Sequence, residues 1–331
     1  MSYLYHNHNM VFSRTVFSRA MGGLFFCFSL VAFAQIGNDA GEWPSYAADA
    51  GSTKYTSLSQ IDGGNFERLK IAWRWQSIDA DLNLEELVEN GSDINFGRLQ
   101  ATPLMIDGVL YMLTTLNQVA AIDAASGTTL WTHNPEVYLS GASISPLGYH
   151  HRGVAYWSDG GQARILLPTN DGYLISLDAS SGAVDTNFAG GRIDLSIGIP
   201  RADRDVPDWQ GAPPVGSVSP PVVVGDTLVV QQITSNRPHY KERPPTWIRG
   251  YDIPTGELKW TFHGIPQQGE FGVETWQEES WRYTGNGGAW SQLSADLELG
   301  LVYLPMEAPT NDFFGGHRPG DNLFTQSLVA L

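Results

Sequence analysis

The chain repeats a short unit that consists of an apolar strand, an Asp, a few small residues, a Gly and a polar-alternating run ending in Trp. One copy is residues 248–260 (IRGYDIPTGELKW), and an earlier copy, AAIDAASGTTLW, ends at Trp131 with the same spacing. A strand, a tight turn in which Gly takes positive φ, and a second strand form a hairpin. The terminal Trp needs an apolar neighbour, which the next copy can supply. A chain built in this way is expected to close into a ring.

Longer segments repeat as well. ATPLMIDGVLYML has a Pro, a strand, the turn Asp107-Gly108 and a second strand, and SPPVVVGDTLVV has the turn Gly225-Asp226 at the corresponding offset. A degenerate copy at residues 165–182 keeps the Asp and the Gly but has no terminal Trp, and a fourth copy begins at Trp290. Recurring four-stranded units without the helices of a parallel sheet predict an all-β fold, a β-propeller. About four units are visible where a ring of seven or eight would need roughly twice as many, so the sequence predicts an incomplete propeller.

Other segments can be placed around these units. Residues 66–75 (FERLKIAWRW) alternate like a strand with Ile71, Trp73 and Trp75 on one face, and residues 79–93 read as a short helix or an insertion loop. Long insertions between hairpins are expected to form a binding face at one end of the propeller. These insertions are residues 134–164, 235–247 and 307–326.

Composition limits the class of partner. The chain has 331 residues, 42% of them hydrophobic, and its 19 basic and 35 acidic residues give a formal net charge of -16. A surface for nucleic acid or an anionic membrane needs the opposite charge. We therefore expect an acidic, globular protein that does not bind nucleic acid.

The N-terminus has the pattern of an export signal. Arg14 and Arg19 precede an apolar run at residues 21–33, and Ala32-Phe33-Ala34 matches a cleavage site, so residues 1–34 are predicted to be a signal peptide. The alternative is an uncleaved anchor. The only cysteine, Cys27, lies within this segment. A mature chain starting at Gln35 would therefore have no disulfide, thiolate zinc site or covalently attached haem.

The repeated unit resembles the tryptophan-docking motif of the pyrroloquinoline quinone (PQQ) dehydrogenases, and residues 35–331 resemble the N-terminal half of that family's eight-bladed propeller. The pattern is closer to the glucose dehydrogenase branch than to methanol dehydrogenase, because the loop at Pro146-Leu147 lacks adjacent cysteines. The stretches that carry the resemblance are WPSYAADAGSTKYTSL, HHRGVAYW, IRGYDIPTGELKW and LVYLPMEAPTNDFFGGHRPGDNLFTQSLVAL.

The resemblance implies a set of cofactor-binding residues. PQQ is a flat tricarboxylate, which needs an aromatic floor and cationic or hydrogen-bonding partners. In this sequence Trp290 would be the floor, Arg152 would hold the quinone edge, and Gln100 and Ser217 would be hydrogen-bond partners. Read without the family, Trp290 is one more core Trp of a propeller and Arg152 is part of a loop salt bridge.

The resemblance also implies a divalent cation, Ca²⁺ or Mg²⁺, held by oxygen ligands. Asn236 and Thr310 fall on ligand positions. The family's Asp-Asn is Ser235-Asn236 here, and its Gly-Asn before Pro is Glu307-Ala308. Losing an anionic ligand weakens cation binding unless a carboxylate such as Glu307 or Asp312 replaces it.

Two histidines, His150 and His151, lie on the loop expected to overhang the site. They are candidates for contact with substrate hydroxyls, although paired loop histidines are more often solvated. The general base of the family is an Asp expected beyond Leu331. No catalytic residue is therefore assigned, and the 331-residue chain alone is expected to be inactive.

The resemblance thus predicts a periplasmic quinoprotein oxidoreductase, with membrane association left open. It would oxidise a sugar or alcohol hydroxyl by hydride transfer to metal-bound PQQ and pass electrons to a respiratory acceptor, either ubiquinone or cytochrome c. The alternative is a quinone-free propeller that acts as a protein-binding scaffold, because the same docking motif occurs in such proteins.

Overall fold

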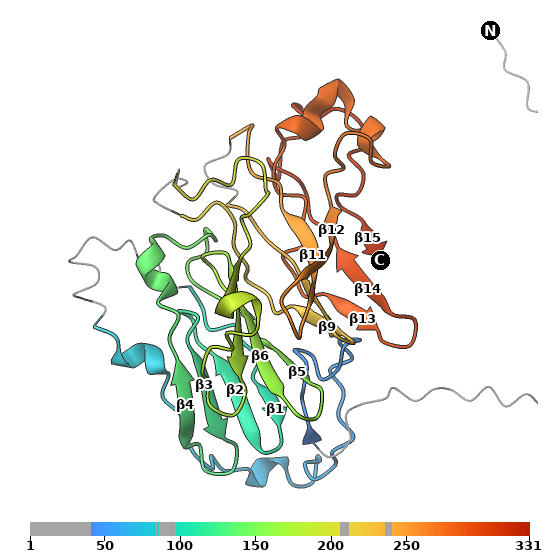
Figure 1. The fold of residues 1–331 in the computed structure, drawn as a ribbon. Coiled ribbons are helices and arrows are strands. Elements are labelled where there is room, and N and C mark those ends of the chain that lie inside the picture. The colour runs from blue at the N-terminus through green and yellow to red at the C-terminus, as the bar shows by residue number, and fades with distance from the viewer. Residues whose placement is uncertain (1–40, 84, 86–93, 95–96, 206–211, 236–239) are drawn as a thin grey trace, which may run out of the picture. The chain divides into compact units, whose positions relative to one another are not determined.

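A computed structural model of the chain describes residues 41–331, apart from 84, 86–93, 95–96, 206–211 and 236–239. The described residues form antiparallel sheets in chain order, three with four strands and a fourth with three (Figure 1). In each sheet, strands that follow one another in sequence are neighbours. This arrangement confirms the predicted all-β fold with an incomplete propeller of about four blades.

The first two sheets consist of β1 (Leu104–Ile106), β2 (Val109–Leu113), β3 (Val119–Asp123) and β4 (Thr129–His133), followed by β5 (Ala155–Ser158), β6 (Ala163–Pro168), β7 (Tyr173–Asp178) and β8 (Arg192–Asp194). The last two consist of β9 (Val222–Val224), β10 (Thr227–Val230), β11 (Trp247–Asp252) and β12 (Leu258–His263), followed by β13 (Ser294–Asp296), β14 (Leu301–Pro305) and β15 (Leu328–Ala330). The short 3-10 helices are η2 (Phe66–Arg68), η3 (Ile78–Asp81), η4 (Val137–Ser140), η5 (Ala189–Gly191), η7 (Val273–Thr275) and η8 (Gln277–Arg282).

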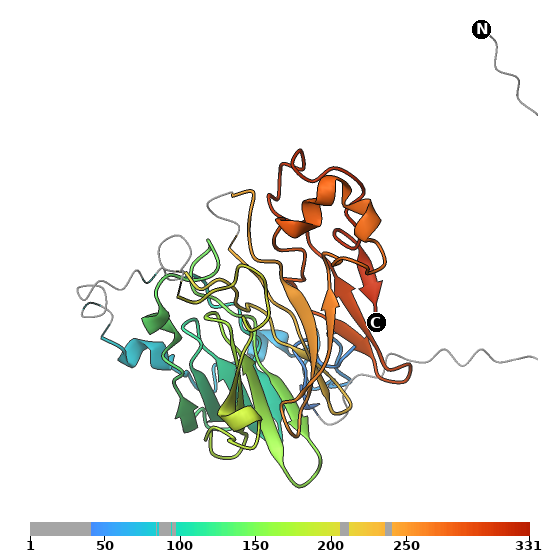
Figure 2. The ribbon, with the colours of Figure 1, turned by 45° about the horizontal axis from the view of Figure 1, so that its top comes forward.

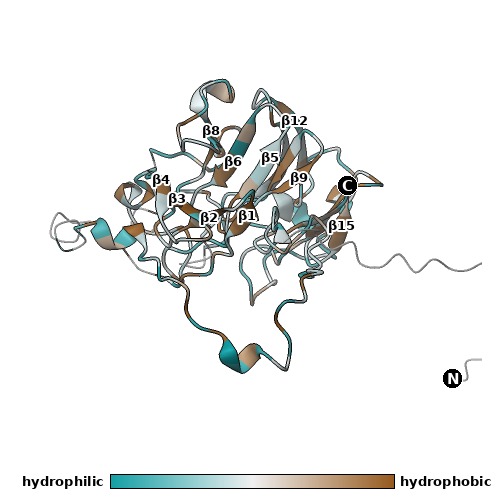
Figure 3. Cartoon of the chain, turned by 90° about the horizontal axis from the view of Figure 1, so that it is seen from below, coloured by the Kyte–Doolittle hydropathy of each residue, from teal (hydrophilic) through white to brown (hydrophobic). Residues whose placement is uncertain are grey.

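The core lies between the faces of successive sheets (Figure 2). Leu104 and Val119 of the first sheet pack in one cluster with Ile165 and Leu177 of the second. Similar clusters join the second sheet to the third and the third to the fourth. Figure 3 shows apolar residues along strands such as β1, β3 and β9. Because their strands are buried between neighbouring sheets, segments such as β3 and β6 read as nearly continuous apolar runs.

The predicted hairpin turns are present. Ile106 pairs with Val109, which leaves Asp107 and Gly108 as a two-residue turn with φ of +50° and +78°. Two consecutive residues with positive φ match the twist of the flanking strands. In the third sheet Gly225 opens the equivalent turn with φ of +57°.

The repeated Trp and Gly meet between neighbouring sheets. Trp131, at the outer edge of the first sheet, donates from Nε1 to the Ala179 carbonyl oxygen at 3.0 Å. Its ring lies so close to Gly182 that a Cβ there would come within 2.4 Å of it. Trp73 makes the same pair of contacts with the first sheet, donating to the Ala124 carbonyl oxygen at 3.1 Å and lying against Gly127. The Gly of the repeat is therefore needed for the indole of the preceding segment to dock.

The second sheet lacks the terminal Trp and fills the equivalent space differently. Ala189 in η5 lies against Gly256 of the third sheet, where an added Cβ would come within 2.8 Å of the Ala189 Cβ. Arg164 on β6 donates from Nη1 to the Ile253 carbonyl oxygen, which follows Asp252 as Ala179 follows the Asp of its own repeat. An alanine and a guanidinium together replace the ring and the N–H of an indole.

Arg164 is also half of a buried ion pair. Its Nη2 lies 2.6 Å from Oδ2 of Asp185, and both side chains are almost fully buried. A buried guanidinium needs both a counter-charge and hydrogen-bond acceptors. Arg164 has both, because Asp185 neutralises it and two carbonyl oxygens of the third sheet, those of Ile253 and Pro254, accept from it.

The prediction of a strand over residues 66–75 was wrong. The segment begins as η2 and then runs without pairing to a strand among the described residues. Trp73 and Trp75 face the first sheet, where Trp75 donates from Nε1 to the Thr129 hydroxyl at 3.0 Å, but Ile71 is 65% exposed. Alternation of apolar residues does not make a strand when no neighbour supplies a backbone ladder.

The expected insertions fall mostly where predicted. Residues 235–247 lie between β10 and β11, and residues 307–326 lie between β14 and β15. The insertion predicted for residues 134–164 was wrong in its bounds, because β5 lies inside it and opens the second sheet. Residues 79–93 begin in η3, and most of that segment lies outside the described residues.

The predicted signal peptide, residues 1–34, also lies outside the described residues. In the part of the chain that the structure describes, no helix has the length and apolar character needed to cross a bilayer.

Replacing Gly182 with Ala should lower the free energy of unfolding by about 2–4 kcal/mol, through strain at positive φ and a clash with the Trp131 ring. Gly108→Ala is the matched control, because Gly108 has a similar φ of +78° but open space around it. It should cost only about 1–2 kcal/mol of backbone strain. Urea unfolding of both variants tests this, and equal losses would show that the docked indole does not require the glycine.

Replacing Arg164 with Leu should lower the free energy of unfolding by about 3–5 kcal/mol, because Asp185 would be left buried without its counter-charge. Arg282→Leu is the control, because its pair with Glu279 is exposed and its loss should change stability little. Thermal and urea unfolding would measure both. A small loss in the Arg164 variant would mean that the ion pair does not help to join the second and third sheets.

Candidate functional site

The predicted cofactor residues lie at the same end of successive inner strands. Strands β5, β9 and β13 each open a sheet, and β9 contacts both of the others. Arg152, Ser217 and Trp290 come shortly before β5, β9 and β13, and Gln100 comes shortly before β1. Because these strands converge, residues that are far apart in the sequence are brought to one place.

Arg152 and Trp290 are in direct contact. The Cζ of Arg152 lies 4.8 Å from the centroid of the Trp290 ring, within the range of a cation–π interaction. Its Nη1 donates to the Ser219 hydroxyl at 3.0 Å and to the Val218 carbonyl oxygen at 3.2 Å. Ser219 in turn donates to the Trp290 carbonyl oxygen at 2.6 Å. Burial lowers the pKa of Arg152, and a guanidinium still keeps its charge at neutral pH.

Ser219 was missed by the sequence analysis, which selected Ser217. The Ser217 side chain is 1% exposed, and its hydroxyl donates to the Ser219 carbonyl oxygen at 3.2 Å. Ser217 therefore supports the segment, and Ser219 makes the contacts with Arg152 and Trp290. Ser219, which precedes Pro220, is nearer than Ser217 to the start of β9. Its place in the sequence could have indicated its role, because the inner strands converge at that end.

Gln100 is partly exposed on a segment that runs beside the Arg152 loop. The Thr102 N–H donates to the Arg152 carbonyl oxygen at 3.0 Å, and Gly153 follows with φ of +148°. A Cβ on Gly153 would lie 3.3 Å from the Thr102 carbonyl oxygen. The close approach of these two segments thus depends on a glycine.

Trp290 lies on the wall of a cavity of about 390 Å³. This volume is in the range of small-molecule sites. The lining residues that the structure describes are mostly apolar; they are Ile144, Ser145, Pro146, Leu147, His150, Val218, Ile233, Thr234, Trp290, Glu307, Ala308, Asp312 and Phe313. Trp290 is 46% exposed, so part of its ring is accessible to a ligand. Arg152 is not among these lining residues and packs against the ring.

The two histidines are buried, in contrast to the solvated alternative. His150 lines the cavity, with Nδ1 2.8 Å from the Gly148 carbonyl oxygen. His151 is 1% exposed and does not line the cavity; its Nδ1 accepts from the Gly153 N–H at 3.2 Å. Burial lowers the pKa of both, and with the nearby charges of His150 and Arg152 it lowers the pKa of His151 to about 3. Both rings are therefore neutral at pH 7, and His150 alone is placed to touch a ligand.

Of the two predicted metal ligands, only Thr310 can be placed, and it does not line the cavity. Asn236 lies outside the described residues. Thr310 is 1% exposed, and its hydroxyl oxygen accepts from the Gly285 N–H at 3.0 Å, behind the residues that line the cavity. In the described part of the chain, no group of three or more His, Cys, Asp or Glu side chains is arranged to hold a metal.

Glu307 and Asp312 do line the cavity. The Oε1 atom of Glu307 is buried and has no hydrogen-bond partner among the described residues. Burial, with a smaller contribution from the negative charge of Asp312, raises the pKa of Glu307 to about 8, although Asn286 opposes the shift. The cavity thus joins an accessible indole to a carboxyl group whose hydrogen-bonding capacity is not used.

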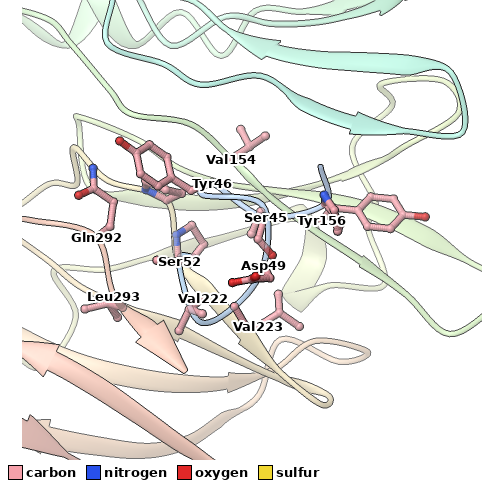
Figure 4. Close-up of a pocket in the computed structure, with 15 residues that line it drawn as sticks. Ser45, Tyr46, Asp49, Ser52, Val154, Tyr156, Val222, Val223, Gln292 and Leu293 are labelled. Carbon is pink, nitrogen blue, oxygen red and sulfur yellow. The ribbon is translucent and has the colours of Figure 1, made fainter. Parts of the chain in front are cut away.

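A second, smaller cavity lies between the loop of residues 44–52 and the inner strands. Figure 4 shows Ser45 and Asp49 of this loop beside Val222 and Val223 of β9. Its volume is about 30 Å³, which accommodates little more than one water molecule. This loop therefore fills the space between the inner strands and does not form a ligand site.

Comparison with known proteins agrees with this geometry. The quinoprotein glucose dehydrogenase of Escherichia coli (strain K12) is 28% identical over 300 residues, which are 88% of this chain and 35% of that protein. The quinohemoprotein alcohol dehydrogenase ADH IIB of Pseudomonas putida is 30% identical over 303 residues, 88% of this chain and 38% of that protein.

The crystal structure of quinohemoprotein alcohol dehydrogenase from Comamonas testosteroni matches with a TM-score of 0.65 and 25% identity, over 88% of this chain and 39% of that one. The chain therefore spans a little over a third of the length of these relatives. Residues 43–331 match the β-propeller domain of the PQQ family, described as glucose/ethanol/alcohol dehydrogenase. The chain belongs to this family of PQQ-dependent dehydrogenases.

Proposed function

We propose that this chain is part of a periplasmic quinoprotein that oxidises the hydroxyl group of a sugar or an alcohol, with PQQ and a divalent cation in the cavity beside Trp290. The observation that carries the proposal is the contact of Arg152 with Trp290 at the wall of that cavity. The names of the relatives, a glucose dehydrogenase and an alcohol dehydrogenase, support both substrate classes.

The residues present fit a planar anionic cofactor. Trp290 offers an exposed part of its ring, and Arg152 places a positive charge 4.8 Å from the ring centre. A flat conjugated ligand on the indole would gain stacking and lie close to the guanidinium. The buried Oε1 of Glu307 in the same cavity needs a partner, which a bound cation would supply.

PQQ bound here would supply an acceptor for the hydride of the carbon that carries the substrate hydroxyl, and a divalent cation would supply a Lewis acid. The contribution of this chain would be to bind and orient. Trp290 would offer the stacking surface, and the hydrogen bond of Arg152 to Ser219 holds the guanidinium against that ring. Pro146 and Leu147 on the cavity wall present apolar surface, which limits the access of water to the reacting atoms.

Export and electron transfer are parts of the same proposal. Arg14 and Arg19 before the apolar run of residues 21–33 support transport to the periplasm. The electrons would then pass to a respiratory acceptor, ubiquinone or cytochrome c. A scaffold propeller would have no need for an accessible indole and a buried carboxyl group in one cavity, so we favour the enzyme.

Titrating the full chain with PQQ should quench its tryptophan fluorescence to saturation. Trp290→Ala should remove most of this saturable quenching and weaken PQQ binding by about tenfold or more, because the stacking surface is lost. Trp281→Ala, which removes an indole that does not line the cavity, should leave the affinity for PQQ unchanged.

An unchanged affinity and amplitude in the Trp290 variant would show that PQQ does not bind on this ring. If the wild-type chain gave no saturable response, the scaffold alternative would be favoured.

A further inference from the structure

Glu307 is a buried acid in need of a partner. It directly follows Met306, after β14, and its N–H donates to the Gly288 carbonyl oxygen at 2.8 Å, which fixes it beside the segment that leads to Trp290. Its Oε1 is buried without a hydrogen bond among the described residues. A carboxylate oxygen buried without a partner is costly, so a protein keeps one where a ligand satisfies it.

Asp312 lies on the wall of the same cavity, five positions later in the sequence. The charge of Asp312 acts on the Glu307 carboxyl, and Arg318 lies close enough to Asp312 for their charges to interact as well. A divalent cation in the cavity would supply the missing partner of the Glu307 Oε1 atom and accept a second carboxylate from Asp312.

Thr310, the position that the family resemblance selects, is arranged differently. Its hydroxyl oxygen accepts from the Gly285 N–H, and its own N–H donates back to the Gly285 carbonyl oxygen, each at 3.0 Å. Its carbonyl oxygen lies 3.0 Å from Nε2 of His317. Thr310 is therefore a structural residue that holds the loop, with its hydroxyl pointing to Gly285.

In the loop that begins at Glu307, carboxyl groups thus take the place of the amide ligand that the family resemblance implies. Ala308 has no side-chain oxygen, and its methyl group lies on the cavity wall next to Glu307. A hard cation accepts carboxylates from almost any backbone position if their oxygens reach it, because six to eight oxygen ligands at roughly 2.3–2.6 Å can be arranged flexibly around Ca²⁺. Glu307 and Asp312 offer the carboxyl groups that Ser235 does not supply.

We propose that Glu307 and Asp312 are the anionic ligands of the divalent cation in this protein, and that Thr310 is not a ligand. This inference rests on the proposed function, since the cation is the one expected to accompany PQQ. It assigns the site to residues on the cavity wall, and further oxygen ligands would come from the backbone and from the cofactor.

Terbium binding tests the assignment without measuring activity. Tb³⁺ occupies Ca²⁺ sites and emits when a nearby indole is excited, and Trp290 lines the same cavity. The full chain should give saturable terbium emission that Ca²⁺ reverses. Glu307→Gln should weaken Tb³⁺ binding by about tenfold or more, because removing a direct ligand costs more metal affinity than removing a residue that only supports a ligand. Asp312→Asn should weaken it in the same direction.

Two controls separate this result from a folding defect or a loss of surface charge. Glu298→Gln makes the same change on an exposed turn and should leave the Tb³⁺ affinity within about twofold of wild type. Thr310→Val removes the acceptor for Gly285 and should lower the melting temperature, but should leave the Tb³⁺ affinity within the same range. If the Glu307→Gln chain proves unfolded by circular dichroism, Glu307→Asp replaces it and should bind with reduced affinity.

The inference is overturned if Glu307→Gln binds Tb³⁺ as wild type does, or if Thr310→Val loses more affinity than Glu307→Gln. Titration with PQQ alone keeps this outcome distinct from the proposed function. Saturable quenching with an unaltered terbium affinity in Glu307→Gln would leave the quinoprotein function standing and reject only the ligand assignment.

Discussion

The structure depends on an indole that lies flat against a glycine of the next sheet. At Gly127 and Gly182 a single methyl group would overlap the docked ring, so the distance between neighbouring sheets is set at the turn after the third strand. The N–H of each indole then fixes its orientation through one carbonyl oxygen. The outer edge of the first sheet is held to the second in this way, and Arg164 and Ala189 hold the second to the third. The inner strands β5 and β9 are in contact, β9 also contacts β13, and the residues before them meet.

The second and third sheets show that this constraint is one of shape and hydrogen bonding, and that Trp is only one way to meet it. Arg164 donates to the Ile253 carbonyl oxygen from a different strand, and Ala189 occupies the place against Gly256. The repeat can therefore lose its Trp without losing the sheet. Arg164 introduces a buried charge between these two sheets, and Asp185 neutralises that charge. The two polar side chains are therefore buried together.

Much of this arrangement could be predicted from the sequence, because the repeat fixes where strands and turns fall. The turn at Asp107-Gly108 follows from its place in the repeat, and the family resemblance predicted that Arg152 and Trp290 lie at one site. Pairing could not be predicted from alternation alone, and the run containing Ile71 has no strand beside it. The sequence also could not separate Ser217 from Ser219, since two residues of one loop differ only in which side chain turns toward the convergence point.

The same limit applies to the cation ligands, for which the family resemblance gives positions but not the orientation of each side chain. Spacing shows that Glu307 and Thr310 share a loop, but which oxygen reaches the cavity depends on how the loop is held. The Thr310 hydroxyl accepts from the Gly285 N–H, and Thr310 does not line the cavity. The Oε1 atom of Glu307 has no hydrogen-bond partner among the described residues, although Asn286 interacts with the same carboxyl group. In a buried site, the side chain whose hydrogen-bonding capacity is unused is the one that a bound ion stabilises most.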